Sequence, residues 1–259
     1  LYVGACPLPP VKISKDHPRY RSLVTRERMA AMVEEGIVAP TGLIAHGRGE
    51  AFDYLLGERT VPEAEAAEAA AAALLVLAKR PVITVNGNTA ALAAKEVGEL
   101  ARVVGAPIEV NLFHRTDQRM ERVCAFVEKE TGLKVLGRDQ DATLAGIASD
   151  RARCTSQGLL AADVVLIPLE DGDRAEAMAR AGKRVIAIDL NPLSRTALAA
   201  EVTVVDELTR AVPNITAWAK RFRGRPEEAR GALASFDNAE GLRAVRERIC
   251  RGLEAPLWK

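Results

Sequence analysis

Short apolar runs alternate with helical stretches from Pro81 onward, and this alternation constrains the fold more than any other feature. The runs are continuous in Val, Ile and Leu, which is typical of strands buried on both faces. Buried strands that alternate with helices form a parallel sheet, because a parallel connection must cross over one face of the sheet. We expect strands at 82–85, 108–112, 133–136, 163–169, 184–189 and 202–205, and hence an α/β protein with a mostly parallel sheet and helices on both faces.

The expected helices divide the chain into two regions. Residues 13–80 are predicted to be helical at 22–35, 50–56 and 62–79, with a break at 39–42. Further helices are expected at 90–104, 117–131, 174–182, 194–200, 206–220, 226–234 and 239–253, whereas 138–160 shows no regular pattern. We therefore predict a leader at 1–12, an N-terminal helical region at 13–80 and an α/β core at 81–259, together forming one structural unit.

Charge and cysteine content limit the classes of function. Lys and Arg number 36 and Asp and Glu 35, so the net charge of +1 indicates no nucleic-acid partner. The four cysteines (Cys6, Cys124, Cys154 and Cys250) lack the C-x-x-C spacing of a metal or redox site. The longest apolar run, 69–78, is too short to cross a bilayer. We expect a cytoplasmic protein with reduced thiols and no membrane partner.

The loop after the first expected strand reads Asn86-Gly87-Asn88-Thr89 and leads directly into a helix. Ligands of parallel sheets gather at the carboxyl ends of the strands, where this loop must lie. With Asn88 or Thr89 as the cap, the free N–H groups of the helix would form an anion pocket. The alternative is a plain tight turn with an ordinary cap.

Three carboxylates, those of Glu170, Asp171 and Asp173, follow the strand expected at 163–169. Their mutual repulsion would be relieved by a cation, and the Mg²⁺ of a bound nucleotide is the obvious one. The alternative is that Asp173 caps the next helix while the other two are solvated.

The strand expected at 184–189 ends at Asp189, and an acidic residue in this position can accept hydrogen bonds from the ribose hydroxyls of a nucleotide. Ser194 is expected to cap the next helix, whose first turn carries Arg195 within reach of a phosphate. The alternative is an Asn-Pro turn followed by an ordinary helix cap.

In the N-terminal region, Arg48 stands between Gly47 and Gly49, two residues after His46. Glycines allow a backbone to approach a ligand closely, and a guanidinium binds phosphate with two parallel hydrogen bonds. The alternatives are a structural hydrogen bond for His46 and a surface ion pair for Arg48.

Five segments of the chain together resemble the archaeal phosphopantothenate synthetase family. The resemblance runs from about His17 to the C-terminal region and is carried by 42–55, 85–92, 109–113, 165–174 and 188–196. It implies a Rossmann-like core and a homodimer. The implied reaction joins 4-phosphopantoate to β-alanine with ATP and releases AMP and pyrophosphate, in coenzyme A biosynthesis.

The resemblance also implies which residues contact ATP. They are Arg26, Arg48, Asp189, Leu190, Asn191, Arg195, Thr196, Glu207 and Leu208. Glu207 departs from the family pattern, in which asparagine is expected at this position.

The implied chemistry suggests further roles. Because a carboxylate acylates poorly, we infer an acyl-adenylate intermediate. His46 and Asn88 are the candidate catalytic residues, with His46 either accepting the proton of the ammonium group or donating a hydrogen bond to a phosphate. The candidate substrate-binding residues are Asn86, Asn88 and Thr89, and those for Mg²⁺ are Glu170, Asp171 and Asp173.

Two other classes of protein compete with the ligase. One is a non-catalytic, nucleotide-binding regulatory α/β protein, which would bind without turnover. The other is a nicotinamide oxidoreductase, although the first expected strand lacks the glycine fingerprint of that class.

Overall fold

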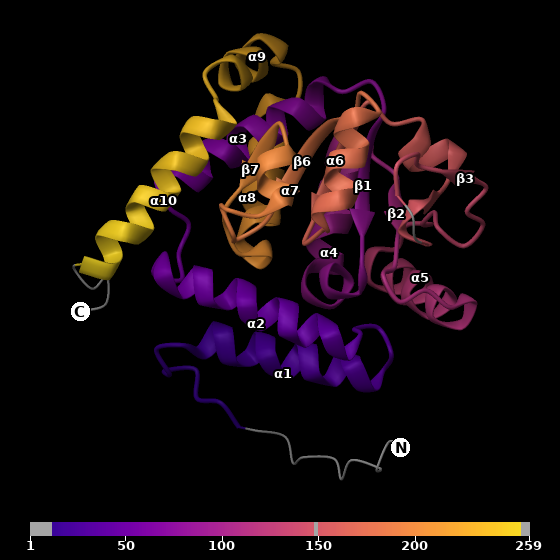
Figure 1. Ribbon diagram of the computed structural model, residues 1–259, viewed down its shortest axis with the longest axis horizontal. Helices are drawn as coiled ribbons and strands as arrows, with labels where there is room; N and C mark the ends of the chain where they lie inside the picture. The colour runs from indigo at the N-terminus through magenta and orange to yellow at the C-terminus, as the bar shows by residue number, and fades with distance from the viewer. Residues whose placement is uncertain (1–11, 148–149, 255–259) are drawn as a thin grey trace.

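The computed structural model describes residues 12–147 and 150–254, so all of the expected leader except Lys12 lies outside the described residues. At its centre is a parallel five-stranded sheet with the strand order β2-β1-β5-β6-β7 (Figure 1). The strands are β1 (Pro81–Val85), β2 (Ile108–Val110), β5 (Val164–Pro168), β6 (Arg184–Ile188) and β7 (Val202–Val204). The predicted α/β class is confirmed.

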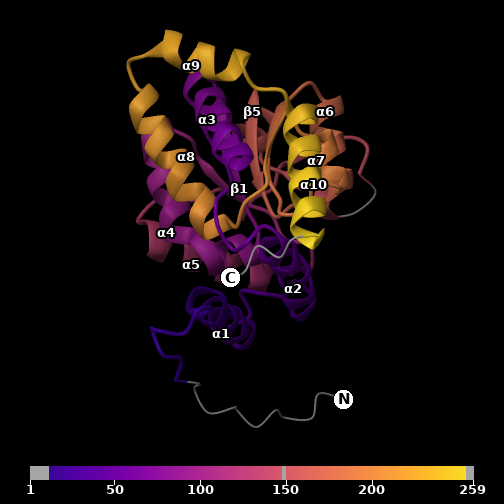
Figure 2. The ribbon, with the colours of Figure 1, turned by 90° about the vertical axis from the view of Figure 1, so that its left-hand side faces the viewer.

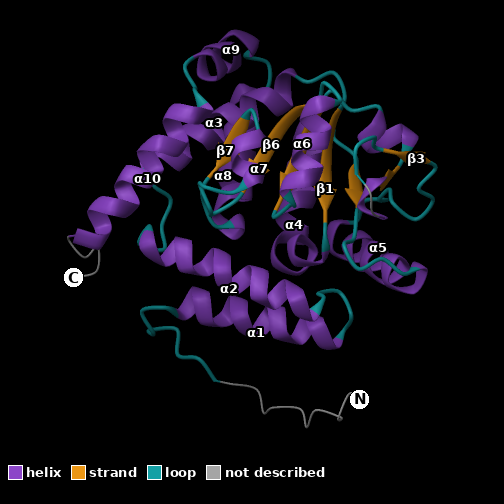
Figure 3. Cartoon of the chain, viewed as in Figure 1, coloured by secondary structure: helices purple, strands orange, loops and turns teal. Residues whose placement is uncertain are grey.

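Helices cover both faces of the sheet and its carboxyl edge. Their bounds are α1 (Tyr20–Glu34), α2 (Pro40–Leu55), α3 (Pro62–Leu77), α4 (Gly87–Val104), α5 (Asp117–Thr131), α6 (Gly172–Arg180), α7 (Arg195–Ala199), α8 (Leu208–Phe222), α9 (Pro226–Ala234) and α10 (Asn238–Glu254). Figure 2 shows α3, α4 and α8 on one side of the sheet and α6, α7 and α10 on the other. Figure 3 shows α1 and α2 together below the sheet. No described helix is long and apolar enough to cross a membrane.

Successive strand residues point to opposite faces of the sheet, and each face has its own hydrophobic core. Ile83, Leu166 and Ile186 are fully buried in the core that includes α3, α4 and α8. Val165 and Ala187 are fully buried in the second core, which includes α6. Burial on both faces explains why the strands read as continuous apolar runs.

The N-terminal region contains one helix where the sequence predicts a break and a short helix. Pro40 lies in the first turn of α2, where its fixed φ favours the helix and its missing N–H is not needed. The expected break at 39–42 is therefore the start of α2, and the helix expected at 50–56 is its end. Gly42 allows α2 to approach α4 closely, since a Cβ here would lie 2.3 Å from Oδ1 of Asn88.

The strand predicted at 133–136 does not form. Leu136 makes only a single parallel bridge, to Glu109 at the edge of the sheet. At Gly137 the backbone has a φ of 124°, and a Cβ there would lie 2.4 Å from the carbonyl oxygen of Val110. The chain therefore turns out of the sheet and enters an irregular segment that holds the short hairpin of β3 (Ala142–Thr143) and β4 (Arg153–Cys154).

Gly87, the first residue of α4, is a point of close contact between the core and the connection from α1 to α2. A Cβ at Gly87 would lie 2.3 Å from the carbonyl oxygen of Ile37 and 2.8 Å from Nη2 of Arg119. That carbonyl already accepts a hydrogen bond of 2.8 Å from Arg119 Nη2. Because a backbone atom blocks the position, a larger residue must displace the connection.

Gly87→Ala is expected to lower the free energy of unfolding by about 1–3 kcal/mol, the usual effect of overpacking. Urea unfolding measures this change. The matched control is Gly231→Ala in α9, where a Cβ meets nothing within 4 Å. Helix propensity should make the control more stable by about 0.5–1 kcal/mol. Equal stability of the two variants would contradict the close contact at Gly87.

Candidate functional site

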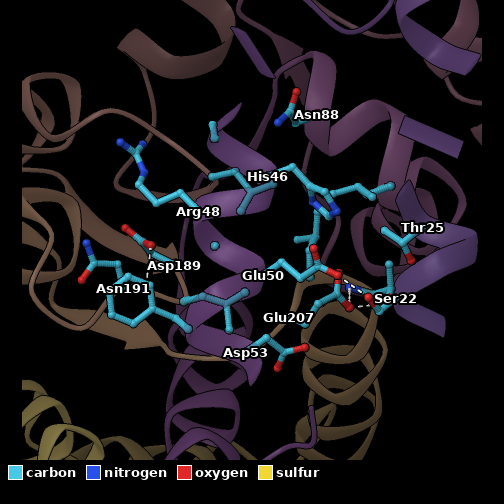
Figure 4. A pocket seen from close by; sticks show the side chains of 18 of the residues that line it. Ser22, Thr25, His46, Arg48, Glu50, Asp53, Asn88, Asp189, Asn191 and Glu207 are labelled. Atoms are coloured by element: carbon cyan, nitrogen blue, oxygen red, sulfur yellow. Dashed lines mark hydrogen bonds between the residues drawn. The ribbon is translucent and has the colours of Figure 1, made fainter. Parts of the chain in front are cut away.

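The sheet has a topological switch point between β1 and β5. The chain continues from β1 to β2 on one side, whereas β5, β6 and β7 extend the other side. At such a point the loops that follow the two strands diverge and leave a crevice at their carboxyl ends. Here the crevice is part of a cavity of about 720 Å³, which is also lined by residues of α1 and α2 (Figure 4).

Asn86 and Thr89 join the two strand ends at the switch point. The Asn86 amide donates to the carbonyl oxygens of Pro168 at 3.2 Å and Leu169 at 2.9 Å. Its Oδ1 accepts a hydrogen bond of 3.0 Å from the Thr89 N–H, so Asn86 caps α4 in place of the expected Asn88 or Thr89. The Thr89 hydroxyl donates to the carbonyl oxygen of Pro168 at 3.2 Å. Asn86 and Thr89 hold the loops and do not line the cavity, whereas Asn88 lines it.

His46 lies on the face of α2 that is turned toward α1 (Figure 4). It lines the cavity, and its Nε2 atom is buried without a hydrogen-bond partner in the described part of the chain. Burial lowers the pKa of His46, although the nearby Glu50 carboxylate acts in the opposite direction. A neutral imidazole with an unpartnered nitrogen suits the role of proton acceptor.

Glu50, one turn after His46, joins α2 to α1. Its carboxylate accepts a hydrogen bond from the Ser22 hydroxyl, and both of its oxygens lie 2.9 Å from Nε of Arg26. Burial alone would raise the pKa of Glu50, but these donors lower it below its usual value. Arg26, an expected ATP contact, is therefore paired with Glu50 and does not line the cavity.

Arg48 extends from the opposite side of α2, toward the loop that follows β6 (Figure 4). In that loop Asp189 accepts hydrogen bonds from the Asn191 N–H, at 2.9 Å, and from the hydroxyl of Ser194, which caps α7 as predicted. Burial raises the pKa of Asp189, and the charge of Arg48 opposes this shift. Asp189, Asn191 and Arg48 give this wall both acceptors and a cation, which suits a sugar next to a phosphate.

Leu190, Arg195 and Thr196 line the same wall. The Thr196 hydroxyl donates to the carbonyl oxygen of Glu170 at 2.8 Å and so links α7 to the loop after β5. Arg195 is largely exposed, and its guanidinium makes two hydrogen bonds of 2.9 Å to Glu176. Arg195 therefore lines the cavity while its guanidinium is paired with the Glu176 carboxylate.

Glu207 lies at the end of β7 and lines the cavity together with Leu208. Its carboxylate accepts a hydrogen bond of 2.8 Å from the Thr209 N–H and another from the Thr209 hydroxyl, and it thereby caps α8. Burial raises the pKa of Glu207 despite these hydrogen bonds. Asparagine, the residue expected from the family pattern, is also a favoured helix cap.

Arginines engage two of the three acidic residues that follow β5. The buried Glu170 carboxylate pairs with Arg151 and Arg174, whose pKa values are lowered by burial. Asp171 lies 3.5 Å from Nη2 of Arg151, and Asp173 is not among the residues that line the cavity. Within 12–147 and 150–254, no group of three His, Cys, Asp or Glu side chains is placed to hold a metal ion. The guanidinium groups of two arginines thus neutralise the Glu170 carboxylate, a role that was expected for Mg²⁺.

Another wall of the cavity carries charged residues that no sequence pattern indicates. Asp53 of α2 pairs with Arg210 of α8, which also pairs with Asp206. Because Asp53 and Arg210 lie 157 residues apart, no local spacing indicates their contact. Ser22 and Thr25 of α1 also line the cavity, and single hydroxyl residues on a short helix give no distinct signal.

Comparison with known proteins shows which family the chain resembles. Residues 63–252 match the family model described as phosphopantothenate/pantothenate synthetase. A relative from Thermococcus onnurineus, named 4-phosphopantoate–beta-alanine ligase, is 46% identical over 96% of this chain and 98% of its own length. Relatives of the same name from Thermococcus kodakarensis and Methanosarcina mazei are 45% and 49% identical, over 96% and 92% of this chain and 98% and 95% of theirs. Because the family model covers most of the chain and the relatives are this similar over nearly its whole length, the protein belongs to the phosphopantothenate/pantothenate synthetase family.

Proposed function

We propose that this protein is an ATP-dependent ligase that joins 4-phosphopantoate to β-alanine. The products are 4′-phosphopantothenate, AMP and pyrophosphate, and the reaction belongs to coenzyme A biosynthesis. One observation carries the proposal: apart from Arg26, every residue expected to contact ATP lines the same cavity at the switch point. The Nε2 of His46 in that cavity is buried and has no hydrogen-bond partner among the described residues, which favours an enzyme over a non-catalytic nucleotide-binding protein.

The chemistry of the cavity wall supports one orientation of the nucleotide. The base lies at Glu207 and Leu208, and the ribose hydroxyls donate to the Asp189 carboxylate. The Arg48 guanidinium then donates to the phosphates. Phosphopantoate binds beside them, at Asn88 and the first turn of α4.

ATP serves to activate a carboxylate that would otherwise acylate poorly. A carboxylate oxygen of phosphopantoate attacks the α-phosphorus, the bond to pyrophosphate breaks, and an acyl-adenylate forms. The neutral amine of β-alanine then attacks the acyl carbon, AMP leaves, and the proton released by the nitrogen passes to Nε2 of His46. The other residues act by positioning the reactants and neutralising charge.

Metal, assembly and location are further parts of the proposal. We assign no protein ligand to the Mg²⁺ that accompanies ATP, because the Glu170 carboxylate is occupied by two arginines. A homodimer follows from the family resemblance alone. Cys124 and Cys154 are buried free thiols, which suits the reducing conditions of a cytoplasm.

The direct test of the function is the release of AMP from ATP by the purified protein in the presence of Mg²⁺ and β-alanine. AMP is expected only when 4-phosphopantoate is also present, with one amide formed per AMP. ADP as the product would indicate an acyl-phosphate route instead. Tight ATP binding without any turnover would support the non-catalytic alternative.

Arg48→Ala is expected to raise the KM for ATP or lower kcat/KM by about tenfold or more, because a charge-assisted contact to phosphate is lost. Steady-state kinetics with saturating phosphopantoate and β-alanine measure the effect. Arg223→Ala is the control, since Arg223 is an exposed arginine beyond the end of α8. Wild-type kinetics in Arg48→Ala would remove Arg48 from the site.

His46→Gln is expected to separate the two half-reactions. Exchange of pyrophosphate into ATP with phosphopantoate alone should stay near the wild-type rate, whereas amide formation should fall by about 10²-fold or more. His114→Gln is the control, because His114 lies outside the cavity and contacts the Thr41 hydroxyl at 3.2 Å. Equal loss of both half-reactions in His46→Gln would contradict the assigned role.

The same role predicts the pH dependence of amide formation. The imidazole accepts a proton only when neutral, so the rate falls as the pH drops through the pKa of His46. Because burial lowers this pKa, the acid limb should lie below the ordinary value of 6.5. An acid limb above that value in the wild-type enzyme would argue against His46 as the acceptor.

A further inference from the structure

We propose that Arg210 is a positioning residue for the nucleotide, because it holds α2 and the start of α8 together across the cavity. The inference rests on the proposed function, since it takes ATP as the ligand of the cavity. Arg210 is distinct from the residues that the family resemblance assigns to ATP.

The geometry of Arg210 is that of a bridge between two carboxylates. Its Nε and Nη2 donate to Oδ1 of Asp206 at 3.0 Å and 2.6 Å. Its Nη1 donates to Oδ2 of Asp53 at 3.2 Å, and its Nη2 also contacts the other oxygen of Asp53. Asp53 is on α2, Asp206 follows β7 and Arg210 is in the first turn of α8, so one guanidinium connects three parts of the fold.

The two carboxylates depend on Arg210 for compensation of their charge. Asp53 is 6% exposed and Asp206 is 2% exposed, so water screens neither of them well. Burial raises the pKa of Asp53, and the Arg210 guanidinium opposes that shift. Removing one partner of a buried ion pair leaves an uncompensated charge, which is strongly unfavourable. Without Arg210, Asp53 and Asp206 would repel each other and the polyphosphate of ATP.

The attachment of α2 makes this bridge important. Asp53 is the only buried residue of α2, so apolar packing contributes little to holding the middle of this helix. Arg48 and His46 lie five and seven residues before Asp53 on the same helix, within about two turns of it. A displacement of α2 at Asp53 would therefore move the proposed phosphate contact and the proposed proton acceptor together.

The other end of the bridge sets the position of the proposed base site. Asp206 accepts a hydrogen bond of 2.8 Å from the N–H of Glu207 and another of 2.5 Å from the Thr60 hydroxyl. Glu207 and Leu208 then begin α8 at the edge of the cavity. By fixing Asp206, Arg210 fixes this segment relative to the loop that follows β6.

The test measures ATP binding by calorimetry in the absence of the other substrates, so it needs no turnover. Arg210→Gln is expected to weaken ATP binding by about tenfold or more relative to the wild type. Arg210→Lys keeps the charge but not the planar fork and should lie between the two. Arg248→Gln is the matched control, because Arg248 forms a similar two-point pair with Glu63, at 2.9 Å for both bonds, between α10 and α3 and outside the cavity. It should bind ATP as the wild type does.

A double variant separates positioning from a general loss of structure. In Asp53→Asn/Arg210→Gln the uncompensated Asp53 charge is gone, so ATP binding should be no weaker than in Arg210→Gln and should recover in part. A purely structural role would give additive or greater loss. Where Arg210→Gln does not fold, Arg210→Lys and Asp53→Asn carry the test, and each should bind ATP more weakly than Arg248→Gln.

The outcomes distinguish this inference from the proposed function. If the wild-type protein does not bind ATP, the proposed function fails. If the wild type binds ATP, and Arg210→Gln or its substitutes bind as tightly as Arg248→Gln, the positioning role of Arg210 is overturned while the function stands.

Discussion

The side-chain amide of Asn86 is the contact on which the cavity depends. At the switch point β1 and β5 stop pairing, so the carbonyl groups of the last residue of β5 and of the residue after it have no partner in β1. The Asn86 amide N–H group donates to both of these carbonyls. Its amide oxygen accepts a hydrogen bond from the Thr89 N–H and so caps the start of α4. Leu169, one of the two acceptors, has a φ of 53°, a left-handed conformation that is uncommon outside glycine. One side chain thus fixes both edges of the crevice and the start of the helix beside it.

Around this crevice, arginine–carboxylate pairs hold together the separate elements that form the wall. The loop after β5 is held by Glu170 with two buried arginines, α1 is joined to α2 by Glu50, and α2 is joined to α8 through Arg210. Such pairs are directional, whereas apolar packing is not. A binding site whose walls come from separate elements needs directional contacts if the ligand groups are to stay in register.

Local sequence patterns predict most of the fold. The buried strands and the helix at 117–131 follow from hydrophobic runs and capping residues, and five of the six expected strands form. The two failed predictions have tertiary causes. The strand expected at 133–136 is lost because the chain turns out of the sheet at Gly137, and the break expected at 39–42 is absent because Gly42 lies within α2, in close contact with Asn88. The cavity-lining residues that follow β6 could be predicted because strand ends are local features. The pairing of Asp53 with Arg210 could not, because it joins elements that are distant in sequence.

The alanine-rich helix α3 has a consequence for how this architecture finds its correct alignment. Most of the buried side chains of α3 are alanines, so its surface is smooth apart from two buried leucines near its C-terminal end. A helix surface made mostly of alanines can slide and rotate against its neighbours at little cost in contact area. The position of α3 along its axis must then be fixed by contacts of its few polar side chains. Burial raises the pKa of Glu68 to about 8, and its Oε1 accepts a hydrogen bond of 3.1 Å from Asn214 of α8, while Glu63 pairs with Arg248 of α10. The polar contacts of these two glutamates with α8 and α10 thus fix the position of α3 along its axis.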